Sequence, residues 1–248
     1  MTEATFRIWR GGADGDGRFV EYRTPVSEGM VVLDAVHRVQ AEQAPDLACR
    51  WNCKAGKCGS CSAEINGRPK LMCMTRLNTL DLDAPVTVEP MRAFPPIRDL
   101  VTDVSWNFRV KPTLQRFTPR APDGPDGTWR MAQRDIDRVQ EFRKCIECFL
   151  CQDVCHVIRD HGKQDAGFIG PRYFVYAAAL EMHPLDTASR LEDLKARNGI
   201  GYCNITKCCT NVCPEHIHIT DNAIIPLKER VVDRFYDPVT RLLRLFRS

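Results

Sequence analysis

The sequence predicts an α+β fold in two parts, with strands in the N-terminal part and helices in the C-terminal part. Residues 4–10 and 18–24 alternate apolar and polar side chains, which is typical of strands. Residues 131–144 and 221–235 instead repeat apolar side chains at the spacing of an amphipathic helix. Most of the 13 cysteines lie in tight groups, one in the first part and two in the second. We therefore expect each part to fold around its own cysteines.

The chain is long enough for two ordinary domains. Its 248 residues can bury a core in each half, and its 44% hydrophobic and 27% charged residues are typical of a soluble globular protein. The net charge of +3 is too small to indicate a nucleic-acid partner. Residues 90–97 are proline-rich and suit a domain boundary. We predict one domain over residues 1–105 and a second over residues 106–248.

The cysteines indicate metal binding in a reducing compartment. Their count is odd, they are clustered, and the chain is much longer than secreted domains that disulfides hold together. The N-terminus has neither the apolar region of an export signal nor a twin arginine, and no window approaches roughly 18 consecutive apolar residues. We expect the chain to stay in the cytoplasm, so that partner subunits would have to hold it at a membrane.

The N-terminal part is expected to begin as a hairpin followed by a helix. A glycine-rich turn at residues 11–17 separates the first two predicted strands. Apolar residues then fall on one face of a predicted helix over residues 30–40. Farther along, Asn66 and Gly67 predict the tight turn of a second hairpin.

The first cysteine group has the spacing of a [2Fe–2S] site. Cys53, Cys58 and Cys61 are spaced C-x4-C-x2-C, and Cys73 follows at the end of the second predicted hairpin. This is the plant-type pattern with a distant fourth cysteine. A zinc ribbon would instead need two C-x2-C pairs. We predict a plant-type ferredoxin (β-grasp) domain with these four cysteines as cluster ligands, and a free thiol at Cys49.

The stretch from Cys145 to Cys155 predicts two further clusters. Cys145, Cys148, Cys151 and Cys155 are spaced C-x2-C-x2-C-x3-C, a run that is too crowded for two disulfides. In such a run the first three thiolates bind one [4Fe–4S] cube and the fourth binds a neighbouring cluster. One ligand of that cube must therefore come from elsewhere in the chain.

The last cysteine group can supply the missing ligands. Counting back from Cys213 and the proline that follows it, the same pattern would need cysteines at 209, 206 and 203, but position 206 is threonine. The rule of the crossing fourth cysteine then gives two sets. The predicted [4Fe–4S] ligands are Cys145, Cys148, Cys151 and Cys213, and the predicted ligands of a three-thiolate cluster are Cys155, Cys203 and Cys209.

The threonine in this register predicts a [3Fe–4S] cluster. A cube with only three thiolates tends to lose the iron that has no protein ligand, and Thr206 stands where that ligand would be. Cys208 leaves an alternative open, because its thiol could act as a fourth ligand and keep a [4Fe–4S] cube. We expect the Cys208 side chain to point away from the vacant corner and to be a buried free thiol.

The C-terminal part is predicted to be an all-α, bacterial-ferredoxin-like domain that binds these two clusters. Apolar spacing predicts further helices over residues 98–108, 168–180, 186–197 and 238–246. Residues 241–248 are basic and amphipathic. For this tail a partner surface, an anionic membrane surface and a plain terminal helix are all open.

The motifs together resemble the iron–sulfur subunit of the succinate dehydrogenase/fumarate reductase family. The resemblance runs over nearly the whole chain, and the family also has a residue other than cysteine at the position of Thr206. The matching segments are the cysteine group 53–61, Pro-Ile-Arg-Asp-Leu-Val at 96–101, the run that starts at Cys145, Phe-Ile-Gly-Pro at 168–171, and residues 203–214.

The resemblance implies an electron-transfer subunit of a succinate dehydrogenase (quinone). It implies a flavoprotein partner with FAD that interconverts succinate and fumarate, and membrane-anchor subunits where quinone binds. This chain would carry electrons from the FAD through the [2Fe–2S], [4Fe–4S] and [3Fe–4S] clusters to quinone, and none of its residues would act on succinate itself. It would lie on the cytoplasmic side of the plasma membrane, held there by the anchor.

One segment departs from the family. The residues after the equivalent of Cys155 usually begin with proline and carry tryptophans of the quinone pocket, whereas residues 156–161 contain neither. His156, Arg159 and His161 are the candidates to line the quinone site or to face the anchor. Ordinary polar residues near an interface would look the same.

Two alternatives remain open. The same clusters would serve a fumarate reductase or another flavin dehydrogenase, because the choice of substrate lies in the flavoprotein. A zinc-bound module without redox function is the alternative of a different class, and iron and sulfide content would separate it from an electron carrier.

Overall fold

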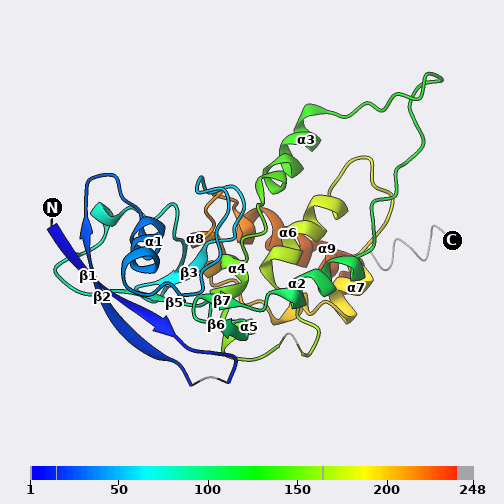
Figure 1. The fold of residues 1–248 in the computed structure, drawn as a ribbon. Helices are drawn as coiled ribbons and strands as arrows, with labels where there is room; N and C mark the ends of the chain where they lie inside the picture. Colours follow the sequence, from blue (N-terminus) through cyan, green and yellow to red (C-terminus); the bar gives the residue numbers. More distant parts are fainter. Residues whose placement is uncertain (1, 15, 164, 239–248) are drawn as a thin grey trace. The chain divides into compact units, whose positions relative to one another are not determined.

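The computed structural model describes residues 2–14, 16–163 and 165–238, which divide into two compact units (Figure 1). The first unit contains the residues up to 105 together with 146–154 and 212–214. The second contains 106–145, 155–211 and the residues from 215 onward. Two short segments that the sequence-based division assigned to residues 106–248 thus pack within the first unit.

A five-stranded mixed sheet is the centre of the first unit (Figure 1). The strands are β1 (Thr2–Arg10), β2 (Arg18–Val26), β3 (Ser62–Ile65), β4 (Arg68–Leu71) and β5 (Val86–Glu89), in the order β2-β1-β5-β3-β4. Strand β1 pairs antiparallel with β2 and parallel with β5, while β3 pairs antiparallel with both β4 and β5. The first predicted hairpin is therefore present as β1 and β2.

Helix α1 (Val32–Glu42) packs beside β2 and buries one apolar face. Leu33, Val36 and Val39 are fully buried and recur at helical spacing. The helix begins where the Asp34 carboxylate accepts a hydrogen bond from the backbone N–H of Val31, at 3.1 Å. This carboxylate satisfies a donor that a helix start would otherwise leave unpaired.

The hairpin of β3 and β4 brings the chain from the first cysteine group to Cys73. Its turn residues, Asn66 and Gly67, have φ of 48° and 71°. A two-residue hairpin turn of type I′ needs positive φ at both positions, which asparagine and glycine adopt at the lowest cost. The remaining elements of this unit are the 3₁₀-helix η1 (Leu77–Thr79), the strand pair β6 (Pro96–Arg98) and β7 (Val101–Thr102), and α4 (Leu150–Asp153).

The second unit is built from helices and turns, in agreement with the predicted α+β fold class. Helix α6 is its central element and packs against η5, α3 and α9 (Figure 1). Tyr173, Phe174 and Ala177 of α6 are fully buried. The elements are α2 (Ser105–Val110), η2 (Lys111–Thr113), α3 (Gln133–Gln140), η3 (Glu141–Lys144), α5 (His156–Arg159), α6 (Gly170–Glu181), α7 (Leu191–Ala196), η4 (Ile200–Tyr202), α8 (Cys208–Asn211), the π-helical η5 (Ile219–Ile224) and α9 (Ile225–Phe235).

The predicted helix over residues 98–108 is wrong for its first half. Strands β6 and β7 lie there instead, and Asp99 between them has a φ of 48°. The Asp99 carboxylate accepts hydrogen bonds from the backbone N–H groups of Gly11 and Ala48, at 3.0 and 2.8 Å. These contacts with distant segments hold the chain out of the helical conformation, and the helix starts only at Ser105.

The predicted helix over residues 186–197 is shorter than expected and covers Leu191–Ala196. Asp186 instead accepts hydrogen bonds from the backbone N–H of Ala188 and from the fully buried guanidinium of Arg190, at 2.9 and 2.8 Å. A side chain that bonds its own downstream backbone favours a turn over a helix. The predicted helix over 238–246 and the tail 241–248 lie outside the described residues, apart from Pro238.

Candidate cluster-binding cysteines

The four cysteines of the first group lie together in the first unit. Cys61 and Cys73 are buried, Cys58 is half-buried and Cys53 is exposed. The loop wraps around the Cys53 sulfur, which accepts hydrogen bonds from the backbone N–H groups of Ala55 and Lys57, at 3.4 and 3.3 Å. Amides aimed at a cysteine sulfur are the contacts that stabilise a thiolate and tune a cluster.

The thiols of this group also affect one another's protonation. Burial raises the pKa of Cys61 to about 12. A hydrogen bond from the Cys73 backbone opposes this rise, while the Cys73 thiol and Cys58 add to it. For Cys58 burial acts in the same direction, but hydrogen bonds from Ser60 and Cys53 outweigh it and lower the pKa to about 7. Four free thiols that interact in this way have the chemistry of a thiolate ligand set.

The middle of the second cysteine run, residues 146–154, belongs to the first unit together with Cys213. Cys148 and Cys151 are buried, and Cys213 is half-buried. Cys148 lies between Glu147 and Phe149, whose φ values are 54° and 61°. Positive φ on both sides of Cys148 turns the backbone sharply at this cysteine. Cys145 directly precedes this segment in the chain.

A third set of cysteines comes together in the second unit. Cys155 and Cys209 are buried, and Cys203 is half-buried. Burial raises the pKa of Cys155 to about 11, although hydrogen bonds from the Ile158 and Val157 amides act to lower it. The nearby thiol of Cys203 is among the groups that raise this pKa further. The structure thus brings together the three thiols that the sequence predicts as one ligand set.

The structure corrects the expected direction of Cys208. Its sulfur accepts a hydrogen bond from the Thr206 hydroxyl at 3.3 Å and acts electrostatically on Cys155. A hydrogen bond with Cys209 is the main cause of a low Cys208 pKa of about 5. Lys207, with a φ of 61°, directly precedes Cys208, which is the first residue of α8. Cys208 therefore lies beside the third set, and its side chain does not point away.

Models of two iron–sulfur domain families match the chain. A "2Fe-2S iron-sulfur cluster binding domain" matches residues 5–109, and a "4Fe-4S dicluster domain" matches residues 141–217. These matches cover the cysteines of all three groups and agree with the predicted [2Fe–2S] and [4Fe–4S] binding.

Curated relatives identify the family. The chain is 34% identical over 203 residues to the fumarate reductase iron–sulfur subunit of Mycobacterium tuberculosis (strain CDC 1551 / Oshkosh), which covers 80% of each protein. The chain belongs to the iron–sulfur subunits of the succinate dehydrogenase/fumarate reductase family. It is also 28% identical over 208 residues to the succinate dehydrogenase iron–sulfur subunit of Paracoccus denitrificans, covering 83% of this chain and 78% of that one.

A solved structure agrees with this family. A chain of the Mycobacterium smegmatis Sdh1 complex in the apo form is 61% identical and superposes with a TM-score of 0.91, over 96% of this chain and 98% of that chain. The predicted family and the predicted α+β fold of this iron–sulfur subunit are thereby confirmed.

The three residues predicted near the quinone site follow Cys155 on and after α5. His156 is half-buried and hydrogen-bonds the Cys208 sulfur. Its ring also contacts the ring of exposed His161, with 6.0 Å between the centroids. Arg159 occupies the last turn of α5 and is half-buried. The structure thus brings His156 and His161 together beside the third cysteine set.

Two polar residues beside this set were missed by sequence reasoning. The Lys228 ammonium of the iron–sulfur subunit donates a hydrogen bond to the Cys203 carbonyl, at 2.5 Å. The Thr220 hydroxyl lies 3.5 Å from the Cys209 sulfur. A cation near an electron carrier stabilises the more negatively charged, reduced state. Neither residue has a motif of its own, because helix η5–α9 places them there through the tertiary fold.

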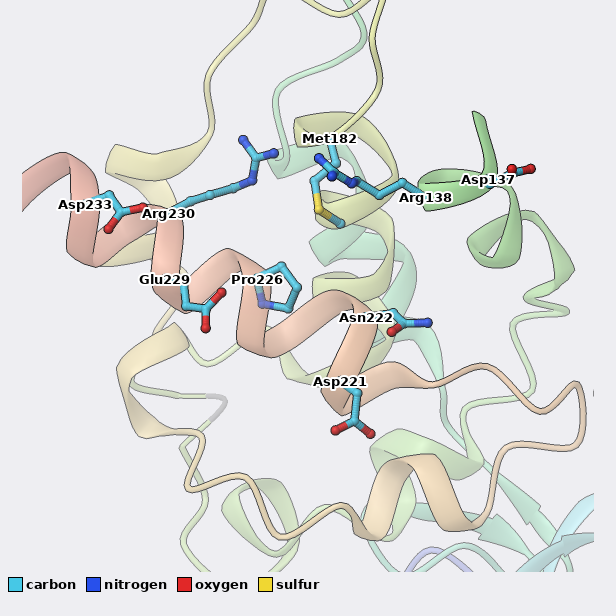
Figure 2. A pocket seen from close by; sticks show the side chains of 9 residues that line it. All are labelled: Asp137, Arg138, Met182, Asp221, Asn222, Pro226, Glu229, Arg230 and Asp233. Atoms are coloured by element: carbon cyan, nitrogen blue, oxygen red, sulfur yellow. The ribbon is translucent and has the colours of Figure 1, made fainter. Parts of the chain in front are cut away.

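A charged cleft in the second unit contains none of the cysteines. Its volume is about 660 Å³, and Arg138 and Arg230 extend towards Met182 from opposite sides (Figure 2). Carboxylates surround these arginines, so the cleft has no single sign of charge. It is lined by Asp137, Arg138, Met182, Asp221, Asn222, Pro226, Glu229, Arg230 and Asp233.

Among the described residues of the subunit, no helix is both long and apolar enough to cross a membrane. Within the same residues, no three histidine, cysteine or acidic side chains converge as they would around a single metal ion. The thiol sets described above instead have the donor chemistry that iron–sulfur clusters need, because cysteine thiolates are their usual ligands.

Proposed function

We propose that this chain is the electron-transfer subunit of a succinate:quinone oxidoreductase. It would pass electrons from the FAD of a flavoprotein partner to quinone at membrane-anchor subunits. The observation that carries the proposal is the order and spacing of three cysteine sets in a chain of this family. When bound, the clusters supply one-electron redox chemistry, and the protein supplies their positions, their insulation and their electrostatic surroundings.

The proposed ligand sets follow the spacing of the cysteines. By sequence, the domain of residues 1–105 would hold a [2Fe–2S] cluster and the domain of residues 106–248 would supply the ligands of the other two, although its residues 146–154 and 212–214 pack within the first unit. The proposed ligands are Cys53, Cys58, Cys61 and Cys73 for [2Fe–2S]; Cys145, Cys148, Cys151 and Cys213 for [4Fe–4S]; and Cys155, Cys203 and Cys209 for [3Fe–4S]. The hydrogen bonds to Cys53 and the interactions among Cys58, Cys61 and Cys73 support the first set, and the interaction of Cys155 with Cys203 supports the third.

The quinone would bind near the third set. His156, Arg159 and His161 are proposed to line the quinone site or to face the anchor, supported by the contacts of His156 with Cys208 and His161. We propose that the subunit lies on the cytoplasmic side of the plasma membrane as a peripheral member of its complex.

A fumarate reductase is a second candidate, favoured by the names of several relatives. The clusters would be the same in either enzyme, because the flavoprotein binds the substrate. Comparing the rate of succinate oxidation by quinone with the rate of fumarate reduction by quinol in the purified complex would distinguish the two candidates.

The experiment for this proposal is iron and sulfide analysis with EPR of the complex, purified without oxygen. We expect all three clusters and, in the oxidised complex, the signal of a [3Fe–4S] cluster, because Thr206 occupies the fourth ligand position. A colourless protein that contains zinc would refute electron transfer.

Two variants test the ligand register of the third set. Thr206→Cys is expected to convert the [3Fe–4S] signal into that of a [4Fe–4S] cluster, because it restores the missing thiolate. Cys208→Ser is the matched variant and should leave the [3Fe–4S] signal unchanged. A [4Fe–4S] cluster in the unaltered protein that is lost in Cys208→Ser would instead make Cys208 the fourth ligand.

A further inference from the structure

The first cysteine group and the second cysteine run touch inside the first unit. Gly59 lies between Cys58 and Cys61, and it packs directly on the backbone of Cys148. A Cβ atom at Gly59 would lie 2.5 Å from the Cys148 Cα and 3.0 Å from its backbone nitrogen. Only glycine allows this approach, and the φ of +69° also favours it.

A hydrogen bond crosses the same contact. The Ser62 hydroxyl lies 2.9 Å from the Gly59 carbonyl and 2.9 Å from the Cys148 carbonyl, and it can donate to both as a three-centre bond. Ser62 is buried, so water does not compete for this hydroxyl. Because Ser62 directly follows Cys61, its hydrogen bond to the Cys148 carbonyl joins the loop of the first cysteine group to the loop of the second cysteine run.

Neighbouring contacts hold the two segments in this register. The Asp153 carboxylate accepts a hydrogen bond from the backbone N–H of Ala93, at 3.0 Å. The rings of Phe94 and Phe149 meet edge to face, with 6.4 Å between their centroids. Helix α4 also packs against β4. The contact at Gly59 is therefore part of the core of the unit and not a chance approach of two loops.

The contact provides a continuous path from one proposed ligand to another. From Cys61 the path follows the backbone to Ser62, crosses one hydrogen bond to the Cys148 carbonyl, and continues through covalent bonds to the Cys148 sulfur. Electron tunnelling is weakened far less by covalent and hydrogen bonds than by an empty gap. The path contains no such gap.

We propose that the Gly59–Ser62–Cys148 contact is the electron bridge between the first two cluster sites. The inference rests on the proposed function and deepens it by naming the residues that couple these sites. One electron leaves the group held at Cys61, which is oxidised, and reduces the group held at Cys148. No bond forms or breaks in this step, and no proton needs to move. Ser62 acts as a positioning residue.

The test uses the assembled complex and two measurements other than turnover. The first is the rate at which an electron injected by flash photoreduction passes from the [2Fe–2S] to the [4Fe–4S] cluster. The second is the pair of midpoint potentials from EPR-monitored titration. Ser62→Ala is expected to slow the transfer several-fold with both potentials unchanged, and Ser62→Thr, which restores the hydroxyl, is expected to recover the rate.

A second pair of variants tests the close approach. Gly59→Ala places a methyl group against Cys148 and should slow the transfer more than Ser62→Ala does. Gly67→Ala is its matched control, because Gly67 has a similar φ of +71° but open space around the added Cβ. It carries the same kind of backbone strain and should leave the transfer rate unchanged.

The outcomes separate this inference from the proposed function. An unaltered complex without the two clusters would refute the proposed function, and with it the bridge. With both clusters present, an unchanged rate in Ser62→Ala, or a slower rate fully explained by shifted potentials, would refute the bridge alone. If Gly59→Ala does not assemble, the Ser62 variants decide the question.

Discussion

Asp99 joins three segments of the first unit through one carboxylate. It accepts hydrogen bonds from the amides of Gly11 and Ala48 and from the Arg10 guanidinium, the last at 3.0 Å. Only 4% of the Asp99 side chain and 17% of the Arg10 side chain are exposed. Ala48 leads directly into the segment that carries Cys53, so this carboxylate fixes the chain before the first cysteine group.

Replacing Asp99 should therefore destabilise the first unit strongly. Asp99→Ala is expected to cost about 3 kcal/mol, because it leaves two amides and one N–H of the Arg10 guanidinium without this acceptor, while Arg10 keeps its bonds to Asp46 and Tyr22. Asp99→Asn should cost less, since asparagine keeps one oxygen acceptor and tolerates the positive φ. The measurement is the temperature at which the visible circular dichroism of the [2Fe–2S] cluster is lost.

Glu21→Ala serves as the comparison for this prediction. Glu21 pairs with Arg7 at 3.6 Å, but 63% of its side chain is exposed. Exposed ion pairs contribute about 0–1 kcal/mol to stability, so the thermal midpoint of Glu21→Ala should stay close to that of the unaltered protein. Equal losses in the Asp99 and Glu21 variants would show that the buried network contributes no more than a surface pair.

Residue types and spacing were enough to predict the cysteine groups. A C-x4-C-x2-C group and the run from Cys145 have few other chemical uses, so the family was also predictable. The direction of Cys208 was not, because two left-handed residues near it reshape the turn. Ser62 and Lys228 were missed for a related reason. Their roles depend on which distant segments pack against them, and no local pattern records that.

A carboxylate also links two elements of the second unit. Glu141 of η3 accepts hydrogen bonds from the backbone N–H of His218, at 2.8 Å, and from the Asn222 side chain, at 2.5 Å. The His218 ring nitrogen lies 2.7 Å from the same carboxylate. Burial alone would raise the pKa of Glu141, but these hydrogen bonds outweigh it and lower the pKa below its ordinary value of 4.5.

The lowered pKa predicts a loss of stability in acid. Glu141 binds its proton less readily in the folded state than in the unfolded state. Its contribution to the stability of the folded state is therefore fully present above pH 4.5, and it is lost as the pH falls through the lower pKa of the folded state. Near neutral pH, Glu141→Gln should lower the free energy of local opening of η5 by about 1–3 kcal/mol. Hydrogen exchange of the η5 amides measures this opening, after correction for the intrinsic effect of pH.

The difference between the unaltered protein and Glu141→Gln should shrink below pH 4.5. Glu229→Gln removes the same charge from an exposed position on α9 and should leave η5 exchange unchanged at every pH. A Glu141→Gln difference that stays constant through the acid range would contradict the link to ionisation.

Elements with strong apolar periodicity were predictable, and elements shaped by side-chain contacts were not. Residues 30–40 and 168–180 predicted α1 and α6 closely. The errors at residues 98–108 and 186–197 have one cause. Asp99 and Asp186 use their carboxylates for contacts with distant or downstream backbone, and this outweighs a helical preference.

The first unit is discontinuous in sequence. Phe149 lies within the second cysteine run, yet it packs on Phe94 in the first unit and only 5% of it is exposed. Phe149→Ala is therefore expected to destabilise the [2Fe–2S] part of the protein by about 3–5 kcal/mol, although the change lies far from the first cysteine group in sequence. The thermal loss of the [2Fe–2S] visible signal measures the effect.

The matched variant is Phe117→Ala in the second unit. Phe117 is 39% exposed, so its removal leaves a smaller cavity and should not change the thermal midpoint of the [2Fe–2S] signal. A [2Fe–2S] midpoint that is unaffected by Phe149→Ala would show that residues 146–154 contribute no stability to the first unit.

Because the first unit is discontinuous, its parts become available for folding at different times during synthesis. The first unit is incomplete until residues 212–214 have emerged from the ribosome, about 110 residues after residue 105. At roughly 5–20 residues per second, the β-rich part waits on the order of 5–20 s for its last segment. In the first part of that interval, until Phe149 emerges about 44 residues after residue 105, the surface that will receive this side chain is uncovered. The nascent chain needs protection there from aggregation or from premature oxidation of its thiols.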